Sequence, residues 1–244
     1  MSIHINCDLG EGSKHDQDLM PLISACNIAC GGHAGTLESM QHTVKLAMEH
    51  EVEIGAHPSY PDKENFGRKS IDISSEDLKL NIEAQILSLK QIAEAEGAKL
   101  VHVKPHGALY NDAAKDKNIA KIILESLEIL EKNIRLYVPL NSEISRLAMG
   151  KYELYFEAFA DRNYEENYSL VSRQNPNAII TQKEEVFKHL FGMFKDAKIH
   201  SNNGTVLDCK ADTFCLHSDT PDSVKILEYL HKKLAEKGIQ IKHS

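Results

Sequence analysis

The chain has 244 residues, of which 42% are hydrophobic and 26% charged, an ordinary composition for a folded protein with a substantial core. A disordered chain would have a lower hydrophobic content. A formal net charge of −8 without any lysine- or arginine-rich run argues against nucleic-acid binding, and no apolar run approaches the roughly 18 residues that span a membrane.

Seven apolar runs of strand length recur along the chain, at 3–8, 25–30, 52–57, 99–105, 135–140, 154–160 and 211–217. Segments with the apolar spacing of a helix lie between several of them, at 37–47, 76–96 and 119–130, and a last one follows at 221–237. Gly97 and Gly238 stand where two of these helices should end. The alternation predicts parallel strands with helices outside them.

Reactive polar residues follow six of the seven strands. The stretches are INCDLGE at 5–11, NIACGGHAG at 27–35, GAHPSYP at 55–61, VHVKPHGALYN at 101–111, FADR at 159–162 and CLHSDTP at 215–221. Apolar packing alone does not gather acidic, imidazole and cationic groups at strand ends. The pattern therefore predicts an active site on one surface.

The distribution of these residues favours a closed or nearly closed β/α barrel, formed as a single domain over residues 1–244. A doubly wound open sheet is the alternative. An open sheet gathers its site at one or two points where the strand order reverses, whereas a barrel brings every strand end to one face. Segment 161–180 is the longest irregular stretch, and its position after a strand predicts a loop over the site.

Two ionisable residues are the main catalytic candidates. Asp8 ends the first strand, where a carboxylate can act as a general base, orient a water molecule or bind a metal; alternatively, it caps the next helix. Lys104 stands among Val101, Val103 and Leu109, and a buried lysine needs an anionic partner or a lowered pKa. Asp8, a substrate carboxylate or a phosphate could be that partner. A structural ion pair across the barrel is the other interpretation.

Further strand ends add imidazole and guanidinium groups. His33 follows two glycines in a turn whose N–H groups, with the start of the next helix, could cradle an anion, although the chain has no P-loop pattern. Other strands end in histidines, namely His57, His106 and His217. Planar donors that suit a carboxylate or a phosphate come from Arg68, Arg162 and Arg173.

Alternatively, the same residues could bind a divalent metal ion. Four strand-end histidines together with Asp8 could hold one, and the candidate ligands are Asp8, His33 and His57. The spacing from His102 to His106 does not indicate a zinc protease, because Pro105 interrupts it and it lies on a strand. Metal binding is therefore the less favoured interpretation.

The cysteines and the start of the chain indicate a cellular location. The five cysteines are an odd number and stand mostly in apolar runs, which predicts reduced, buried thiols and no disulfide framework. Residues 1–12 lack the basic and long apolar regions of a signal peptide. We therefore expect a cytoplasmic protein.

Read together, the motifs closely resemble the LamB/YcsF-like family, whose members form the A component of the bacterial ATP-dependent 5-oxoprolinase. The resemblance runs from the first strand to the last helix through NCDLGE, NIACGGHAG, GAHPSY, FGR, VKPHGALYN, EAFADR, LVSR and HSDTP, in this order. Thr36 and Ser218 depart from the family pattern, which usually has an Asp and a Gly there, and both border the expected site.

The resemblance implies a distorted seven-stranded β/α barrel, akin to glycoside hydrolase and deacetylase folds. It also implies the ATP-coupled opening of 5-oxo-L-proline to L-glutamate, carried out with two further subunit types, B and C. The catalytic candidates on this basis are Asp8, His33, His57, Lys104, His106 and Asp161. The candidates for binding substrate or ATP are Asn6, Glu11, Arg68, Arg162, Arg173 and His217.

We assign roles as a hypothesis. Asp8 activates water, and His33, His57 and His106 carry protons or orient other groups. Asp161 fixes its neighbour Arg162. The charge of a phosphate or a substrate carboxylate is neutralised by Lys104, Arg68 and Arg162.

Two other functions would use the chain differently. A stand-alone metal-dependent deacetylase or amidohydrolase would use the same strand-end residues, would contain a stoichiometric divalent ion and would act without ATP. A non-catalytic scaffold for a partner enzyme would have apolar residues at the strand ends, which is the opposite of the observed sequence.

Overall fold

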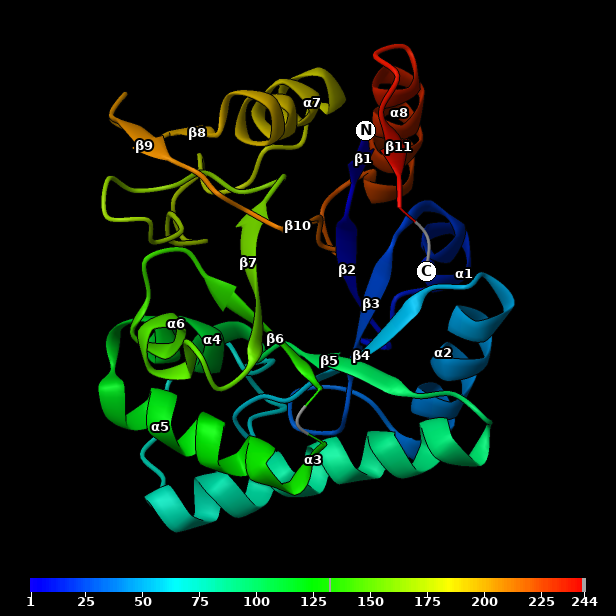
Figure 1. Ribbon diagram of the computed structural model, residues 1–244, viewed down its shortest axis with the longest axis vertical. Coiled ribbons are helices and arrows are strands. Elements are labelled where there is room, and N and C mark those ends of the chain that lie inside the picture. The colour runs from blue at the N-terminus through cyan, green and yellow to red at the C-terminus, as the bar shows by residue number, and fades with distance from the viewer. Residues whose placement is uncertain (132, 243–244) are drawn as a thin grey trace.

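The computed structural model describes residues 1–131 and 133–242, and its centre is a closed barrel of parallel strands (Figure 1). The barrel strands are β2 (Ile5–Leu9), β3 (Ala25–Ala29), β4 (Glu53–His57), β5 (Leu100–Val103), β6 (Arg135–Pro139), β7 (Glu153–Phe159) and β10 (Thr213–Cys215). They follow one another in chain order, and β10 closes the ring between β7 and β2. Each predicted strand region overlaps one of them, and the prediction of a closed barrel is confirmed.

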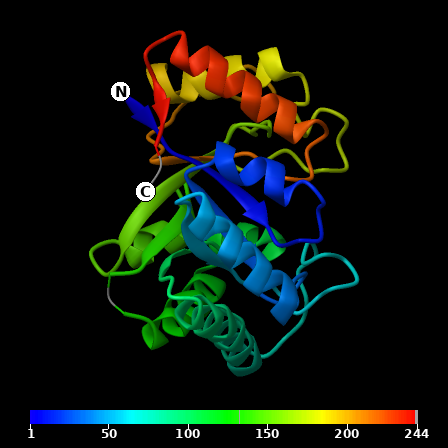
Figure 2. The same ribbon diagram turned by 90° about the vertical axis from the view of Figure 1, so that its right-hand side faces the viewer.

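Helices surround the barrel, as Figures 1 and 2 show from two sides. Four match the predicted helices, namely α2 (Leu37–Glu49), α3 (Ser75–Ala95), α5 (Lys117–Ser126) and α8 (Ser223–Ala235). Their starts are capped where the sequence supplies a hydroxyl, because Thr36 accepts from the Ser39 N–H and Ser74 from the Asp77 N–H. Thr36 thus caps α2 instead of reaching into the site.

Several shorter elements have no clear periodic signal in the sequence. The helices are α1 (Asp16–Leu19), α4 (Gly107–Lys115), α6 (Glu143–Ala148) and α7 (Lys183–Phe191), with short turns η1 (Met20–Leu22), η2 (Leu127–Ile129) and η3 (Gly192–Asp196). Two small ribbons pair β1 (Ser2–Ile3) with β11 (Gln240–Ile241), and β8 (Lys198–His200) with β9 (Val206–Asp208). Within the described ranges, no helix has the length and apolar character that crossing a membrane requires.

The inside of the barrel is polar, whereas its outside packs against the apolar faces of the helices. Successive residues of a strand point to opposite sides, so Asn6 and Asp8 on β2 share one face while Ile5, Cys7 and Leu9 share the other. All five side chains are buried. Burying a polar group without a partner costs about 1–3 kcal/mol, so the inward groups must bond to one another.

Asn27 on β3 connects this interior network. Its amide donates to Asn6 Oδ1 and to Asp8 Oδ1, both at 2.7 Å, and its own Oδ1 accepts from His102 Nε2 at 2.8 Å. His102 lies directly over Gly55, where an added Cβ would stand 2.0 Å from the ring. A glycine in β4 therefore makes room for the histidine that orients Asn27, and Asn27 in turn fixes the carboxylate of Asp8.

Candidate active site

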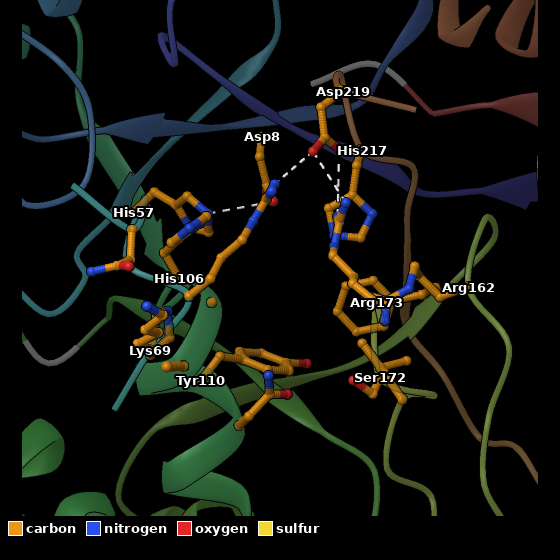
Figure 3. Close-up of a pocket in the computed structure, with 18 of the residues that line it drawn as sticks. Asp8, His57, Lys69, His106, Tyr110, Arg162, Ser172, Arg173, His217 and Asp219 are labelled. Atoms are coloured by element: carbon orange, nitrogen blue, oxygen red, sulfur yellow. Dashed lines mark hydrogen bonds and ion pairs between the residues drawn. The ribbon is translucent and has the colours of Figure 1, made fainter. Parts of the chain in front are cut away.

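The carboxyl ends of the strands open into a cavity of about 460 Å³. Figure 3 shows His57 and His106 on one side of it and His217, Arg162 and Arg173 on the opposite side. The volume lies within the usual range for small-molecule sites, and a barrel places its site at this end. Val171, Ser172, Arg173 and Gln174 line the opening, so the segment predicted to form a loop over the site does so.

Lys104 is the centre of the cavity floor. Its Nζ lies 2.9 Å from Asp8 Oδ1 and 2.9 Å from Glu157 Oε1, with Cys215 Sγ at 3.2 Å. Burial alone would lower the pKa of Lys104, but Asp8, Cys215 and Glu157 raise it well above its ordinary value. The ammonium is therefore charged and already holds two carboxylates. The predicted anionic partner is confirmed as Asp8, and Glu157 is a second one.

Asp8 presents its other oxygen to the imidazoles. Its Oδ2 lies 3.4 Å from His57 Nε2. Burial by itself raises the pKa of Asp8, but its interactions with His57 and Lys104 outweigh burial and hold the pKa well below the ordinary value. Asp8 is therefore ionised at neutral pH and is not the N-cap of a helix. It can orient a water molecule and stabilise positive charge.

Three histidines pack together beside Asp8. His33 and His106 stack with their ring centroids 3.6 Å apart, and His106 Nδ1 lies 2.9 Å from His57 Nε2. Glu11 accepts a hydrogen bond from His33 Nε2 at 2.8 Å. Burial lowers the pKa of His33 and, together with the neighbouring His57 and His33, holds that of His106 well below its ordinary value. Neutral imidazoles at this position can accept a proton or bind a metal.

Asp161 holds His217. Among the described residues no hydrogen bond or ion pair joins Asp161 to Arg162, and its charge acts on that guanidinium from a longer distance. Its carboxylate accepts from the backbone N–H of His217 at 2.9 Å, from the imidazole Nδ1 at 3.0 Å and from the Thr220 hydroxyl. Burial raises the pKa of Asp161, but His217 outweighs this and lowers it to about 2. Asp161 and Arg162 both follow the end of β7 at Phe159, and the guanidinium group of Arg162 donates instead to the carbonyls of Val171 and Ala178.

Arg68 and Arg173 share one carboxylate at the mouth of the cavity. Asp219 accepts from Arg68 Nη2 at 2.6 Å and from Arg173 Nη1 at 3.1 Å. All three residues line the cavity, and Arg68 and Asp219 are exposed. Two guanidinium groups facing one carboxylate leave a net positive charge, which can attract the carboxylate or phosphate of a ligand.

Arg162 also lines the cavity, but its guanidinium group binds the loop. It donates to the Val171 carbonyl at 2.6 Å and to the Ala178 carbonyl at 3.2 Å, and the side chain is buried. These bonds hold Val171, in the middle of the loop, and Ala178, near its end, close to the end of β7. Arg162 is therefore placed to position the loop, and we revise its predicted part in neutralising ligand charge.

We expect Arg162→Gln to loosen this loop. The buried Val171 carbonyl would lose its donor, at a cost of about 1–3 kcal/mol, while the Ala178 carbonyl keeps the Asn163 N–H. Local opening should therefore increase by about tenfold. Hydrogen exchange of residues 163–178 measures this directly. Arg146→Gln, on the exposed side of α6, is the matched control. Unchanged exchange in Arg162→Gln would show that the loop does not depend on this side chain.

The structure brings all twelve predicted site residues to one end of the barrel. Nine of them line the cavity, and the other three lie directly behind it: Asn6 below Asp8, His33 behind His106, and Asp161 behind His217. Sequence analysis missed Glu157 and Asn27. Both are polar residues inside otherwise apolar strands, and such residues rarely stand there without a buried partner.

Comparison with known proteins gives consistent matches along the whole chain. A family model described as the LamB/YcsF family matches residues 3–244. The chain is 40% identical to the A subunit of 5-oxoprolinase from Pyrococcus horikoshii and 43% identical to that from Thermococcus sibiricus, in both cases over 99% of this chain and 97% of the relative. It superposes on the crystal structure of a lactam utilization protein from Thermus thermophilus with a TM-score of 0.92 and 31% identity, covering all of both chains.

Proposed function

The chain belongs to the LamB/YcsF family, and from this premise we propose that it is the A subunit of an ATP-dependent 5-oxoprolinase. In this proposal it hydrolyses 5-oxo-L-proline to L-glutamate together with B and C subunits. The observation that carries the proposal is the meeting of Asp8, His57 and Lys104 in one cavity of a chain whose relatives are named for this enzyme. The name of the Thermus thermophilus protein, which refers to a lactam, points in the same direction.

The chemistry explains why ATP would be needed. The carbon of a five-membered lactam is a poor electrophile, because the ring nitrogen shares its electron pair with the carbonyl group. Transfer of a phosphoryl group from ATP to the amide oxygen removes this stabilisation, so water can add to the carbon. The C–N bond then breaks, the nitrogen takes up a proton and leaves as an amine, and a second water releases phosphate from the new carboxyl group.

The floor of the cavity suits the addition of water. Asp8 is ionised and has one oxygen directed away from Lys104, so it can accept a hydrogen bond from the attacking water. Preorganised groups of this kind contribute roughly 10²–10³ in rate. Lys104 is already neutralised by Asp8 and Glu157. We therefore assign it to holding Asp8, and no longer to binding a substrate anion.

The mouth of the cavity suits an anion. Arg68 and Arg173 face Asp219 there, and a ligand carboxylate or phosphate could take the place of Asp219 against either guanidinium. We assign substrate or ATP binding to these two arginines. We further propose a cytoplasmic location, because ATP is available there and the five free, buried cysteines fit a reducing compartment.

The test is to combine the purified chain with its B and C partners and to measure glutamate formed from 5-oxoproline. We expect glutamate and ADP to appear together, and neither to appear at an appreciable rate when ATP or this chain is omitted. Glutamate formation without ATP by this chain alone would favour the stand-alone amidohydrolase instead. No glutamate under any condition, from three folded subunits, would reject the proposal.

A further inference from the structure

The hydrogen bonds of two histidines fix which nitrogens carry protons. His57 Nδ1 lies 2.7 Å from the carbonyl oxygen of Lys104, and His106 Nε2 lies 3.0 Å from the carbonyl oxygen of Phe66. A carbonyl oxygen can only accept, so both of these nitrogens must donate an N–H. In the neutral rings, the remaining nitrogens, His57 Nε2 and His106 Nδ1, therefore each carry a lone pair.

These two lone pairs face each other. His57 Nε2 and His106 Nδ1 are only 2.9 Å apart, and both rings are buried. The carboxylates add further electron pairs, because Glu11 Oε1 lies 3.5 Å from His106 Nδ1 and 3.9 Å from His57 Nε2, and Asp8 Oδ2 lies 3.4 Å from His57 Nε2. Four electron-pair donors this close together repel one another unless a metal cation or a proton lies between them.

The spacing of the donor atoms suits a metal ion. In a tetrahedral site with metal–ligand bonds of about 2.1 Å, neighbouring ligand atoms lie about 3.4 Å apart. The three separations among His57 Nε2, His106 Nδ1 and Glu11 Oε1 are 2.9, 3.5 and 3.9 Å, which bracket this value. His33 Nε2 stands beside Glu11, and ligand atoms of all four residues lie within 4.8 Å of one another.

The local charge points to a divalent ion. Asp8, Glu11 and Glu157 supply three carboxylates, and the ammonium of Lys104 offsets one of them, which leaves two negative charges beside the imidazoles. Imidazole with carboxylate is a ligand combination that suits zinc and similar first-row metals. Three of the residues, Glu11, His57 and His106, line the cavity, so a ligand there could reach the ion.

We propose that Glu11, His57 and His106, supported by His33, bind one divalent transition-metal ion such as Zn²⁺ at the edge of the cavity. This site differs from the metal ligands expected from the sequence, because Glu11 and His106 are central to it and Asp8 lies at its border. The proposal does not depend on the ATP-coupled reaction. A bound ion would not by itself favour the stand-alone amidohydrolase, which is distinguished by activity without ATP.

The experiment measures metal binding and not turnover. The full-length chain is stripped with a chelator and titrated with Zn²⁺ by calorimetry, and with Co²⁺ by visible spectroscopy, because the intensity of the Co²⁺ bands reports four-coordinate geometry. We expect one equivalent of metal to bind and to raise the melting temperature. Glu11→Gln and His57→Gln, which keep similar side-chain volumes, should weaken binding by at least about 100-fold.

Two control variants locate the ion. His200→Gln removes an exposed histidine on β8 and should leave binding unchanged. His217→Gln removes a histidine from a second potential cluster among the described residues, formed with Asp8 and Cys215, and should also leave binding unchanged. Loss of binding in His217→Gln, retention in His57→Gln, or no stoichiometric binding by the unmodified chain would each overturn the proposal. If the unmodified chain binds no metal, His57 Nε2 and His106 Nδ1 share a proton instead.

Discussion

Asp8→Asn is expected to lower glutamate formation by the assembled enzyme by about 10²–10³-fold while leaving the fold intact. The asparagine has nearly the same shape, and its Oδ1 can still accept from Asn27 and Lys104. What is lost is the negative charge that would orient the attacking water. Steady-state assays of the complex with ATP, at matched concentrations of all three subunits, measure the effect.

The matched control for this variant is Asp18→Asn, which changes an exposed residue of α1. It should retain the activity of the unmodified chain. Asp8→Asn should melt at a lower temperature than the unmodified chain, because the ionised carboxylate stabilises the fold. Circular dichroism at the assay temperature separates a loss of chemistry from a loss of folding. If a folded Asp8→Asn variant turned over 5-oxoproline at a near-normal rate, Asp8 would have no part in activating water.

Lys104→Met is expected to lower the free energy of unfolding by about 3–5 kcal/mol, because it leaves two buried carboxylates without their positive partner. For a chain of this length, that corresponds to a fall in melting temperature of about 10 °C. Adding Glu157→Gln to Lys104→Met should recover part of the loss, since one of the two uncompensated charges is then removed. Thermal and urea unfolding of the single and double variants measure both effects.

The pKa of Asp8 predicts the pH range in which Lys104→Met differs most in stability from the unmodified chain. In the unmodified chain the pKa of Asp8 lies well below its ordinary value of 3.8, so Asp8 contributes stability that is present above about pH 4 and is lost as the pH falls further. Without Lys104 one cause of that low pKa is gone. The stability difference between Lys104→Met and the unmodified chain should therefore be largest near neutral pH and shrink below about pH 4.

Lys99→Met is the matched control for Lys104→Met, because Lys99 is an exposed lysine immediately before β5. It should unfold like the unmodified chain at every pH. A Lys104→Met variant as stable as Lys99→Met at neutral pH would mean that Asp8 and Glu157 do not depend on the ammonium for charge compensation.

The arrangement of the barrel could be predicted because it follows from local patterns. Apolar runs of strand length alternate with helical spacing, and parallel strands joined by helices place all their carboxyl ends on one face. Because the ring is closed, polar residues at the ends of those runs, such as Asp8, His57 and Lys104, lie on one surface. The helices α4 and α7 were harder to predict, because a helix of nine residues carries only a short periodic signal.

The sequence by itself thus determined the fold class and which residues gather at the site. Only the tertiary structure decided their partners: Glu157 opposite Lys104, His217 and not Arg162 beside Asp161, and two imidazole nitrogens with facing lone pairs. The physical reason is that such contacts join side chains dozens of residues apart in the sequence. They depend on strand register and on how the ring closes, which no local pattern of residues encodes.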